Sequence, residues 1–160
     1  MHEGHRQRLK KRFLEEGLDG FTDVQALELL LFYGIPRVDT NPIAHALLDR
    51  FGSLSQVLEA SPEELMKVPG VGENAALLLT LIPQMGRFYM VDRSSRVTIL
   101  QTLEQCANFL VPHFFGRQVE TVFILCLDAK GKLLCCKELG EGGPNSTGVS
   151  IRQIVETAIG

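Results

Sequence analysis

Two glycines flank a single valine, Gly70-Val71-Gly72, just before an apolar segment that is predicted to be helical. Glycine reaches backbone angles that are closed to other residues, so the chain can turn sharply here and present bare amide groups. The first N–H groups of the following helix have no partner within that helix, and they form the positive end of its dipole. This stretch is therefore predicted to bind an anion such as a phosphate group.

A nucleotide-binding glycine loop does not fit the same stretch. The G-x-G-x-x-G pattern requires a third glycine where this chain has Ala75, and it requires a strand before the loop. The preceding residues instead carry signals for the beginning of a helix: Ser61 as the cap, Pro62 after it and Glu64 to complete a capping box. The sequence thus predicts two helices joined by a tight turn.

This arrangement resembles the helix-hairpin-helix motif through an apolar residue, Pro-Gly-apolar-Gly and a later alanine, namely Val68, Pro69, Gly70, Val71, Gly72 and Ala75. The resemblance implies that the amides of Val71, Gly72 and Glu73 hold a DNA phosphate, that Lys67 adds positive charge, and that binding is independent of base sequence. It also implies that Val71 is buried between the helices. Glu73 departs from expectation, since it places an acid at the anion-facing end. A helix-capping turn without a ligand is the alternative.

A cluster of cations near the N-terminus is a second candidate for phosphate contacts. Its members are Arg6, Arg8, Lys10, Lys11 and Arg12. The whole chain has a formal net charge of −3, but the acidic residues lie mostly elsewhere, so the total hides a local basic patch. A solvated face of a surface helix is the alternative interpretation.

Composition indicates a folded globular chain. Of the 160 residues, 45% are hydrophobic and 22% are charged. No apolar run reaches the roughly 18 residues of a membrane span, and the N-terminus does not resemble a signal peptide, so we expect a cytoplasmic protein without a membrane partner. The cysteines are expected to be reduced because they lack metal-ligand or redox spacing; they are Cys106, Cys126, Cys135 and Cys136.

The pattern of elements predicts an α+β fold in two parts. Residues 1–91 contain five amphipathic helical segments and are expected to form an all-helical unit. Among their end signals, Thr22 and Gln25 form a T-x-x-Q capping pattern, and the segment that begins near Pro42 is expected to stop at Gly52. A polar linker is expected over 92–98. Residues 99–160 are expected to contain a helix, an apolar buried strand "VETVFILCLD", a turn "DAKG", a returning strand "KLLCCKEL" and a last helix.

Three segments together resemble bacterial RadC-type proteins: "DVQALELLLFYGIPRVDTNPIAHALLDRFGSLSQVLEA", "VETVFILCLDAKGKLL" and "GGPNSTGVSIRQIVETAI". The resemblance covers nearly the whole chain and includes the order of its elements. It implies a helix-hairpin-helix unit followed by a JAB (MPN-type) α/β domain. In complete, active members of that lineage, two histidines of an H-x-H motif and an aspartate hold zinc, and an upstream glutamate serves as acid and base.

Carried over to this chain, the resemblance places the upstream glutamate at Glu120, and it assigns loop-ordering roles to Asn145, Ser146 and Arg152. The H-x-H motif and its aspartate are not found in the 160 residues. The histidines of the chain are His2, His5, His45 and His113. None of them lies at a metal-ligand spacing from another histidine, a cysteine or an aspartate. We therefore expect no metal site and no cofactor here, and a JAB domain that is C-terminally truncated, with an incomplete sheet.

The leading hypothesis is a RadC-like protein of DNA repair or DNA metabolism that binds DNA weakly and without sequence preference, from a lineage of zinc metallopeptidases but inactive as this chain stands. One alternative is a non-catalytic JAB-fold scaffold for protein interactions. Another is a peptidase-type protein whose hairpin is only structural. An incomplete sheet would also favour self-association through its open edge.

Overall fold

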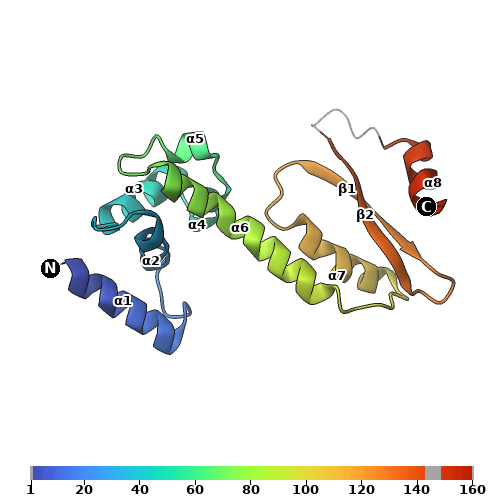
Figure 1. Cartoon of the computed structure of the whole chain (residues 1–160), viewed down its shortest axis with the longest axis horizontal. Coiled ribbons are helices and arrows are strands. Elements are labelled where there is room, and N and C mark those ends of the chain that lie inside the picture. Colours follow the sequence, from blue (N-terminus) through green and yellow to red (C-terminus); the bar gives the residue numbers. More distant parts are fainter. Residues whose placement is uncertain (1, 143–148, 160) are drawn as a thin grey trace. The chain divides into compact units, whose positions relative to one another are not determined.

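The computed structural model describes residues 2–142 and 149–159. The chain forms two compact units, Met1–Pro83 and Gln84–Gly160. The first is helical and the second contains a strand hairpin, which confirms the α+β class. The helices of the first unit are α1 (His2–Glu16), α2 (Asp23–Gly34), α3 (Asn41–Phe51), α4 (Leu54–Glu59), α5 (Pro62–Leu65) and the beginning of α6 (Glu73–Ser94) (Figure 1).

Helix ends in the first unit follow the predicted capping chemistry. The Thr22 hydroxyl accepts the Gln25 N–H at 3.3 Å, and the Gln25 side chain accepts the Thr22 N–H at 3.2 Å, which completes a capping box at α2. Gly52 ends α3 with φ 92° and donates its N–H to the Leu48 carbonyl at 2.7 Å. These local signals fix where the helices begin and end.

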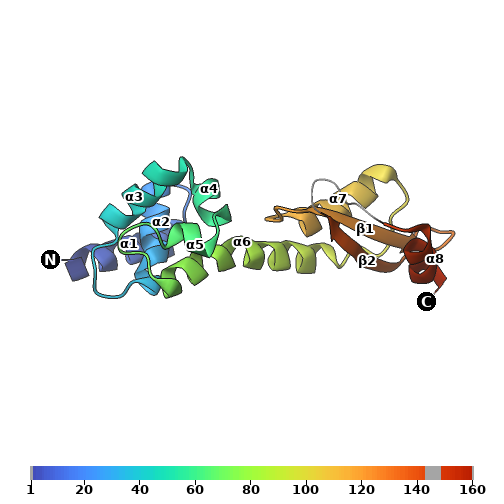
Figure 2. The ribbon, with the colours of Figure 1, turned by 90° about the horizontal axis from the view of Figure 1, so that it is seen from above.

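The helices α2, α3, α4 and α5 gather around the first turns of α6 (Figure 2). One apolar core joins these five helices. Its fully buried side chains come from α2, α3, α4, α5 and α6, and include Leu27, Leu31, Leu47, Val57, Leu65 and Leu79. A smaller cluster of Leu9, Leu29 and Phe32 holds α1 against α2. Burial of side chains of this size, about 1.5–3 kcal/mol each relative to exposure, is the main source of stability in the unit.

Two features of the helices were not predicted. The six-residue α4 is capped by Ser53, whose hydroxyl accepts the Gln56 N–H at 3.3 Å, and it buries Val57. Its shortness leaves too little periodicity to reveal it in the sequence. Helix α6 passes through Pro83 and continues to Ser94, so the first residues of the expected linker are helical.

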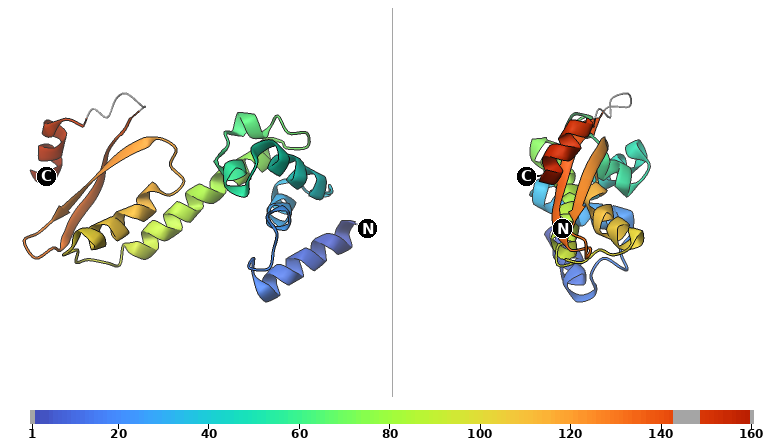
Figure 3. Two further views of the ribbon diagram at one scale, coloured as in Figure 1. Left: turned by 180° about the vertical axis from the view of Figure 1, so that it is seen from behind. Right: turned by 90° about the vertical axis from the view of Figure 1, so that its right-hand side faces the viewer.

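The second unit contains α7 (Leu103–Phe114), β1 (Glu120–Leu127), β2 (Leu133–Gly142) and α8 (Ile151–Ile159). The strands are antiparallel, as predicted, with α7 alongside β1 and α8 next to β2 (Figure 3). The turn between them is held by Asp128, whose carboxylate accepts the N–H groups of Lys130 and Lys132 at 2.8 Å each. Gly131 has φ 79°, as this turn requires.

The expectation that β1 is buried was wrong for the residues described: most of its side chains are half-buried and Glu120 is exposed. The reason is the width of the sheet, since the described residues form only two full strands. Residues 98–100, which precede α7, pair with the residues at the beginning of β2. The Leu133 N–H donates to the Thr98 carbonyl at 2.7 Å, and the Leu100 N–H donates to the Gly131 carbonyl at 2.7 Å. Thr98 lies at the end of the stretch expected as a linker.

Among the helices of the described ranges, none combines the length and the apolar character that crossing a membrane would require.

Candidate functional site

The turn between α5 and α6 is anchored by two valines. Val68 and Val71 are 3% and 6% exposed and join the core of the first unit. The Val71 N–H donates to the Val68 carbonyl at 3.0 Å, which closes the turn. The predicted burial of Val71 is thus confirmed. Its amide is used within the turn, so its contribution to an anion site is to hold the neighbouring backbone in place.

The two glycines of the turn have different roles. Gly70 has φ 91°, and a Cβ there would lie 2.8 Å from Cδ1 of Ile43. Glycine is therefore required at position 70 by the fold itself. Gly72 lies outside the left-handed region, and a Cβ there would have no atom within 4 Å. Packing does not require glycine at position 72, so its absent side chain leaves the backbone of the turn open to approach from outside.

The N-terminus of α6 presents its amides beside Gly72. The first helical hydrogen bond of α6 runs from the Ala76 N–H to the Gly72 carbonyl at 3.0 Å. The N–H groups of residues 73–75 consequently have no partner within the helix. Glu73 and Asn74 are exposed, and Ala75 is buried against the core. The amides available to an anion are those that follow Val71 rather than that of Val71 itself.

Charge around the turn is largely paired. The Glu64 carboxylate contacts the Lys67 ammonium, and its other oxygen accepts a hydrogen bond from Arg50 at 2.9 Å. These two cations hold the pKa of Glu64 below its ordinary value, the hydrogen bond from Lys67 being the larger cause. Glu73 adds an acid in the first turn of α6. Lys67, expected to attract phosphate, therefore has its charge compensated by Glu64.

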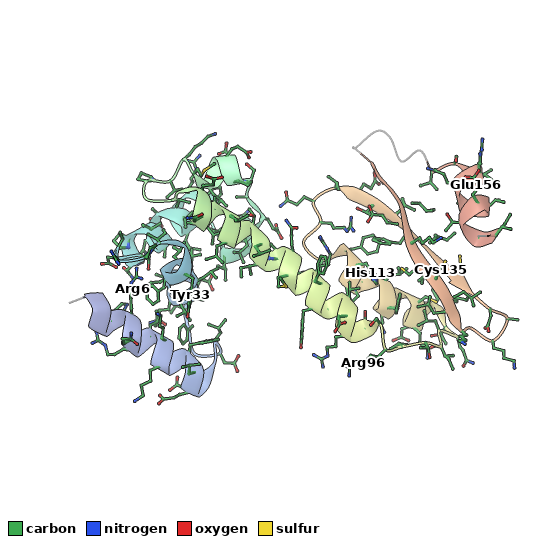
Figure 4. All side chains as sticks on the ribbon, viewed as in Figure 1. Arg6, Tyr33, Arg96, His113, Cys135 and Glu156 are labelled. Atoms are coloured by element: carbon green, nitrogen blue, oxygen red, sulfur yellow. The ribbon has the colours of Figure 1, made fainter. Side chains whose placement is uncertain are left out.

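Arg6 of the basic helix holds the end of α2. Its guanidinium donates to the carbonyl of Ile35 at 2.8 Å and also to the carbonyl of Val38, and it lies 4.7 Å from the centre of the Phe32 ring (Figure 4). A cation at the C-terminal end of a helix satisfies carbonyls that lack a helical partner. This contact positions α1 on α2.

Arg12 has a similar structural role. It donates to the Gly20 carbonyl at 2.6 Å, pairs with Glu16 at 3.2 Å and lies over the Phe21 ring. Of the other three cations of the cluster, Arg8 and Lys11 are exposed and Lys10 is half-buried. Lys10 lies 5.3 Å from the centre of the Tyr33 ring, Lys11 is 3.7 Å from Glu15, and Arg8 is exposed.

Glu120, expected to act as acid and base, is exposed at the beginning of β1, where it faces Gly142 in the ladder. Within residues 2–142 and 149–159, no group of three or more His, Cys, Asp or Glu side chains is placed to hold a metal ion. These residues do not fit the zinc site that the family resemblance implies for complete members. Asn145 and Ser146 lie outside the described residues. Arg152 forms an ion pair with Glu156 at 2.7 Å along α8.

A buried acid in α2 was missed by sequence reasoning. Glu28 is 1% exposed; one carboxylate oxygen lies 2.8 Å from His5 Nε2 and the other accepts a hydrogen bond from the Asn41 side chain at 3.2 Å. Thr40 donates its hydroxyl to the Glu28 carbonyl at 3.2 Å. Glu28 thereby connects α1, α2 and α3. The only signal in the sequence is an acid within a run of leucines.

Each of the two units contains a region that matches a known protein family. Residues 3–77 match the UPF0758 N-terminal family and residues 100–160 match the RadC-like JAB domain family. The chain is similar to a UPF0758 protein of Fusobacterium nucleatum subsp. nucleatum, with 30% identity over 165 residues that cover 99% of this chain and 71% of that protein. No solved structure matches the chain. A UPF0758-type helical unit followed by a RadC-like JAB domain defines a RadC-like protein. The chain belongs to the UPF0758 family.

Proposed function

We propose that the first unit binds the phosphate backbone of DNA weakly and without sequence preference, through the turn between α5 and α6, as part of a RadC-like role in DNA metabolism. The observation that carries the proposal is the open surface at Gly72. Two buried valines hold the turn, and amides at the start of α6 lack a helical partner beside a glycine that packing does not require. Backbone N–H groups at a helix N-terminus are effective donors to phosphate.

Cations of the same unit would supply the long-range attraction. Arg8 and Lys11 are the exposed members of the basic cluster, and the half-buried Lys10 lies beside the Tyr33 ring. Arg6 and Arg12 would support binding indirectly, because their contacts hold α1 on α2. Contacts of this kind fix a protein on the duplex without reading its sequence.

The test is binding of the full chain to a fluorescein-labelled duplex, measured by anisotropy at several salt concentrations. Affinity should fall with salt, with a slope of about −0.9 for each phosphate contacted. Gly72→Val should lower affinity about tenfold or more, since each charge-assisted hydrogen bond contributes about 1.5–3 kcal/mol, while the helical circular dichroism stays unchanged.

The matched control is Gly140→Val in β2, where a Cβ also meets no atom within 4 Å. This variant should bind DNA as the original chain does. A folded Gly72→Val protein with unchanged affinity would remove the turn from consideration as the DNA site.

A second candidate function is a scaffold for protein interactions without catalysis. One observation favours it: Glu64 compensates Lys67 and Arg50 at the turn, which reduces the positive potential that DNA requires. No hydrolytic step is assigned, because the described residues offer no zinc ligand set near Glu120. If the chain shows no salt-dependent retention on DNA, the scaffold function is the better account.

A further inference from the structure

Two cysteines face each other across the hairpin of the second unit. Cys126 of β1 and Cys135 of β2 are directly opposite partners in the antiparallel ladder. Opposite residues of such a pair project from the same face of the sheet, with Cα atoms about 4.5–5.5 Å apart. Disulfides span Cα separations of about 4.4–6.8 Å, so this position allows a cross-link without movement of the backbone.

The third cysteine of the hairpin lies on the other face. The Phe123 ring contacts the rings of His113 and Phe114 in α7, with centroids 5.4 Å and 5.1 Å apart, so this face of the sheet packs against α7. Cys136 is on that face, and its Sγ lies 3.9 Å from His113 Nε2. The pairing from Phe123 to Cys126 is regular, and side chains alternate between faces, so Cys126 projects away from α7.

Cys135 lies on the same face as Cys126, away from α7, because the two are ladder partners. Both are half-buried free thiols, which a small reagent can reach. The adjacent Cys136 therefore points away from this pair.

The chemistry of the pair favours oxidation over metal binding. Hydrogen bonding with Cys135, followed by burial, raises the pKa of the Cys126 thiol, while the charge of Lys137 opposes the shift. Lys137 is opposite Ile124, two positions along the ladder from the cysteine pair. A structural zinc needs about four ligands, and no third ligand joins this pair among the residues described. The two thiols are direct ladder partners, so the pair is instead suited to thiol–disulfide exchange.

We propose that Cys126 and Cys135 are a reversible dithiol–disulfide site whose oxidant is a low-molecular-weight disulfide. The thiolate of one cysteine attacks a sulfur of the reagent, which forms a mixed disulfide and releases one reagent thiolate. The second protein thiolate then attacks the protein sulfur of the mixed disulfide and releases the other. Two electrons pass from the protein to the reagent, and the two thiol protons end on the two reagent thiols.

The disulfide would join the two strands next to a shift in the register of the ladder. The ladder register shifts between Cys126 and Leu127, directly after the cross-strand pair. A bond between the strands at this point closes the turn segment 127–134 into a ring. It would restrict opening and slipping of the strands by lowering the conformational freedom of the unpaired state.

The experiment equilibrates the full chain with mixtures of reduced and oxidised glutathione, blocks the remaining thiols with iodoacetamide and maps the peptides by mass spectrometry. The expected result is a cross-linked pair of peptides joining Cys126 to Cys135, with Cys106 and Cys136 alkylated. In Cys135→Ser, Cys126 should carry glutathione and no intramolecular cross-link. Cys106→Ser is the matched control and should form the cross-link as the original chain does.

A second measurement reports on the same site without relying on the serine variant. Oxidation should slow amide hydrogen exchange in β1 of the original chain and of Cys106→Ser, but not of Cys126→Ala. The proposal is overturned if Cys126 and Cys135 remain alkylatable at every glutathione ratio, if they react only with glutathione, or if the cross-links found join Cys136 or two chains.

Discussion

Gly70 lies against Ile43 of α3 so closely that any Cβ at position 70 would be 2.8 Å from Cδ1 of Ile43. Gly70→Ala adds this overlap to the strain of a left-handed backbone, and should lower the free energy of unfolding by about 2 kcal/mol or more. Gly72→Ala meets no neighbouring atom and should change stability by about 0.5 kcal/mol or less. Urea unfolding followed by circular dichroism compares the two variants. Equal losses would show that the turn has no fixed conformation.

Glu28 supports a second stability prediction. Glu28→Ala removes the acceptor for Asn41 and the partner of His5, and should cost about 1–3 kcal/mol. Glu28→Gln keeps one acceptor of the same size and should cost less. Because His5 belongs to α1, the loss should appear as early loosening of α1, measured by limited proteolysis near Glu16. Glu15→Ala on the exposed face of α1 serves as the control, and proteolysis of α1 as fast in that variant would contradict the role of Glu28.

Local signals predicted much of the first unit. Thr22 and Gln25 form the expected capping box, Gly52 ends α3, and Val71 is buried. What the sequence did not reveal depends on contacts between distant residues. Arg6 looked like a free surface cation, yet its partners are carbonyls 26 to 32 residues away. The Val71 amide looked available, but the turn geometry uses it.

In the second unit, too, local signals predicted the elements but not the contacts between distant residues. An unbroken apolar run and turn chemistry predicted the hairpin, including the turn at Asp128. The apolar run of β1 predicted burial on both faces, but burial depends on what covers the sheet, and that is not a local property of the run. The cross-strand pairing of Cys126 and Cys135 also depends on register, which spacing along the chain does not fix.

Glu64 should weaken DNA binding, which gives a third prediction. Glu64→Gln removes the carboxylate that compensates Lys67 and Arg50, so affinity for duplex DNA should rise and the salt slope should steepen by up to about 0.9 for each cation freed to contact a phosphate. Anisotropy titrations at several salt concentrations measure both. Glu104→Gln in the second unit is the charge-matched control. An equal gain in that variant would trace the effect to net charge alone.

Acidification offers an independent check on Glu64. Its pKa is held below the ordinary value of 4.5 by Lys67 and Arg50, so the carboxylate stays ionised until the pH falls below that value. The ion network therefore persists above this range and is lost as the pH falls through the lowered pKa. The gain in affinity on acidification should begin below pH 4.5 and be smaller in Glu64→Gln. A gain of the same size in both proteins would assign it to other carboxyls.

A fourth prediction concerns metal. A catalytic zinc requires about three protein ligands and an open position, and the described residues provide no such group. The purified chain should therefore hold no stoichiometric zinc after dialysis against a weak chelator, measured by elemental analysis. Glu120→Gln should leave both the metal content and the thermal unfolding unchanged, since the side chain is exposed. One tightly bound zinc per chain would show that the chain does provide a zinc ligand set.

The last prediction concerns the hairpin itself. A two-stranded sheet is only marginally stable in water, and no side chain of β1 is fully buried, whereas several leucines of the first unit are. Amide hydrogens from Val122 to Leu127 should therefore exchange much faster than those around Leu79 in α6. An open strand edge can also pair with a second copy of the chain, so exchange in β1 should slow as protein concentration rises.

Two measurements distinguish these effects. Sedimentation reports the oligomeric state at each concentration, and Val122→Pro should abolish the concentration dependence because it removes a backbone donor from the strand. Exchange around Leu79 should be the same at all concentrations. If β1 in a monomeric chain exchanges as slowly as the core of the first unit, then neither the marginal hairpin nor the self-association is correct, and contacts made by α7 and α8 are sufficient to stabilise the sheet.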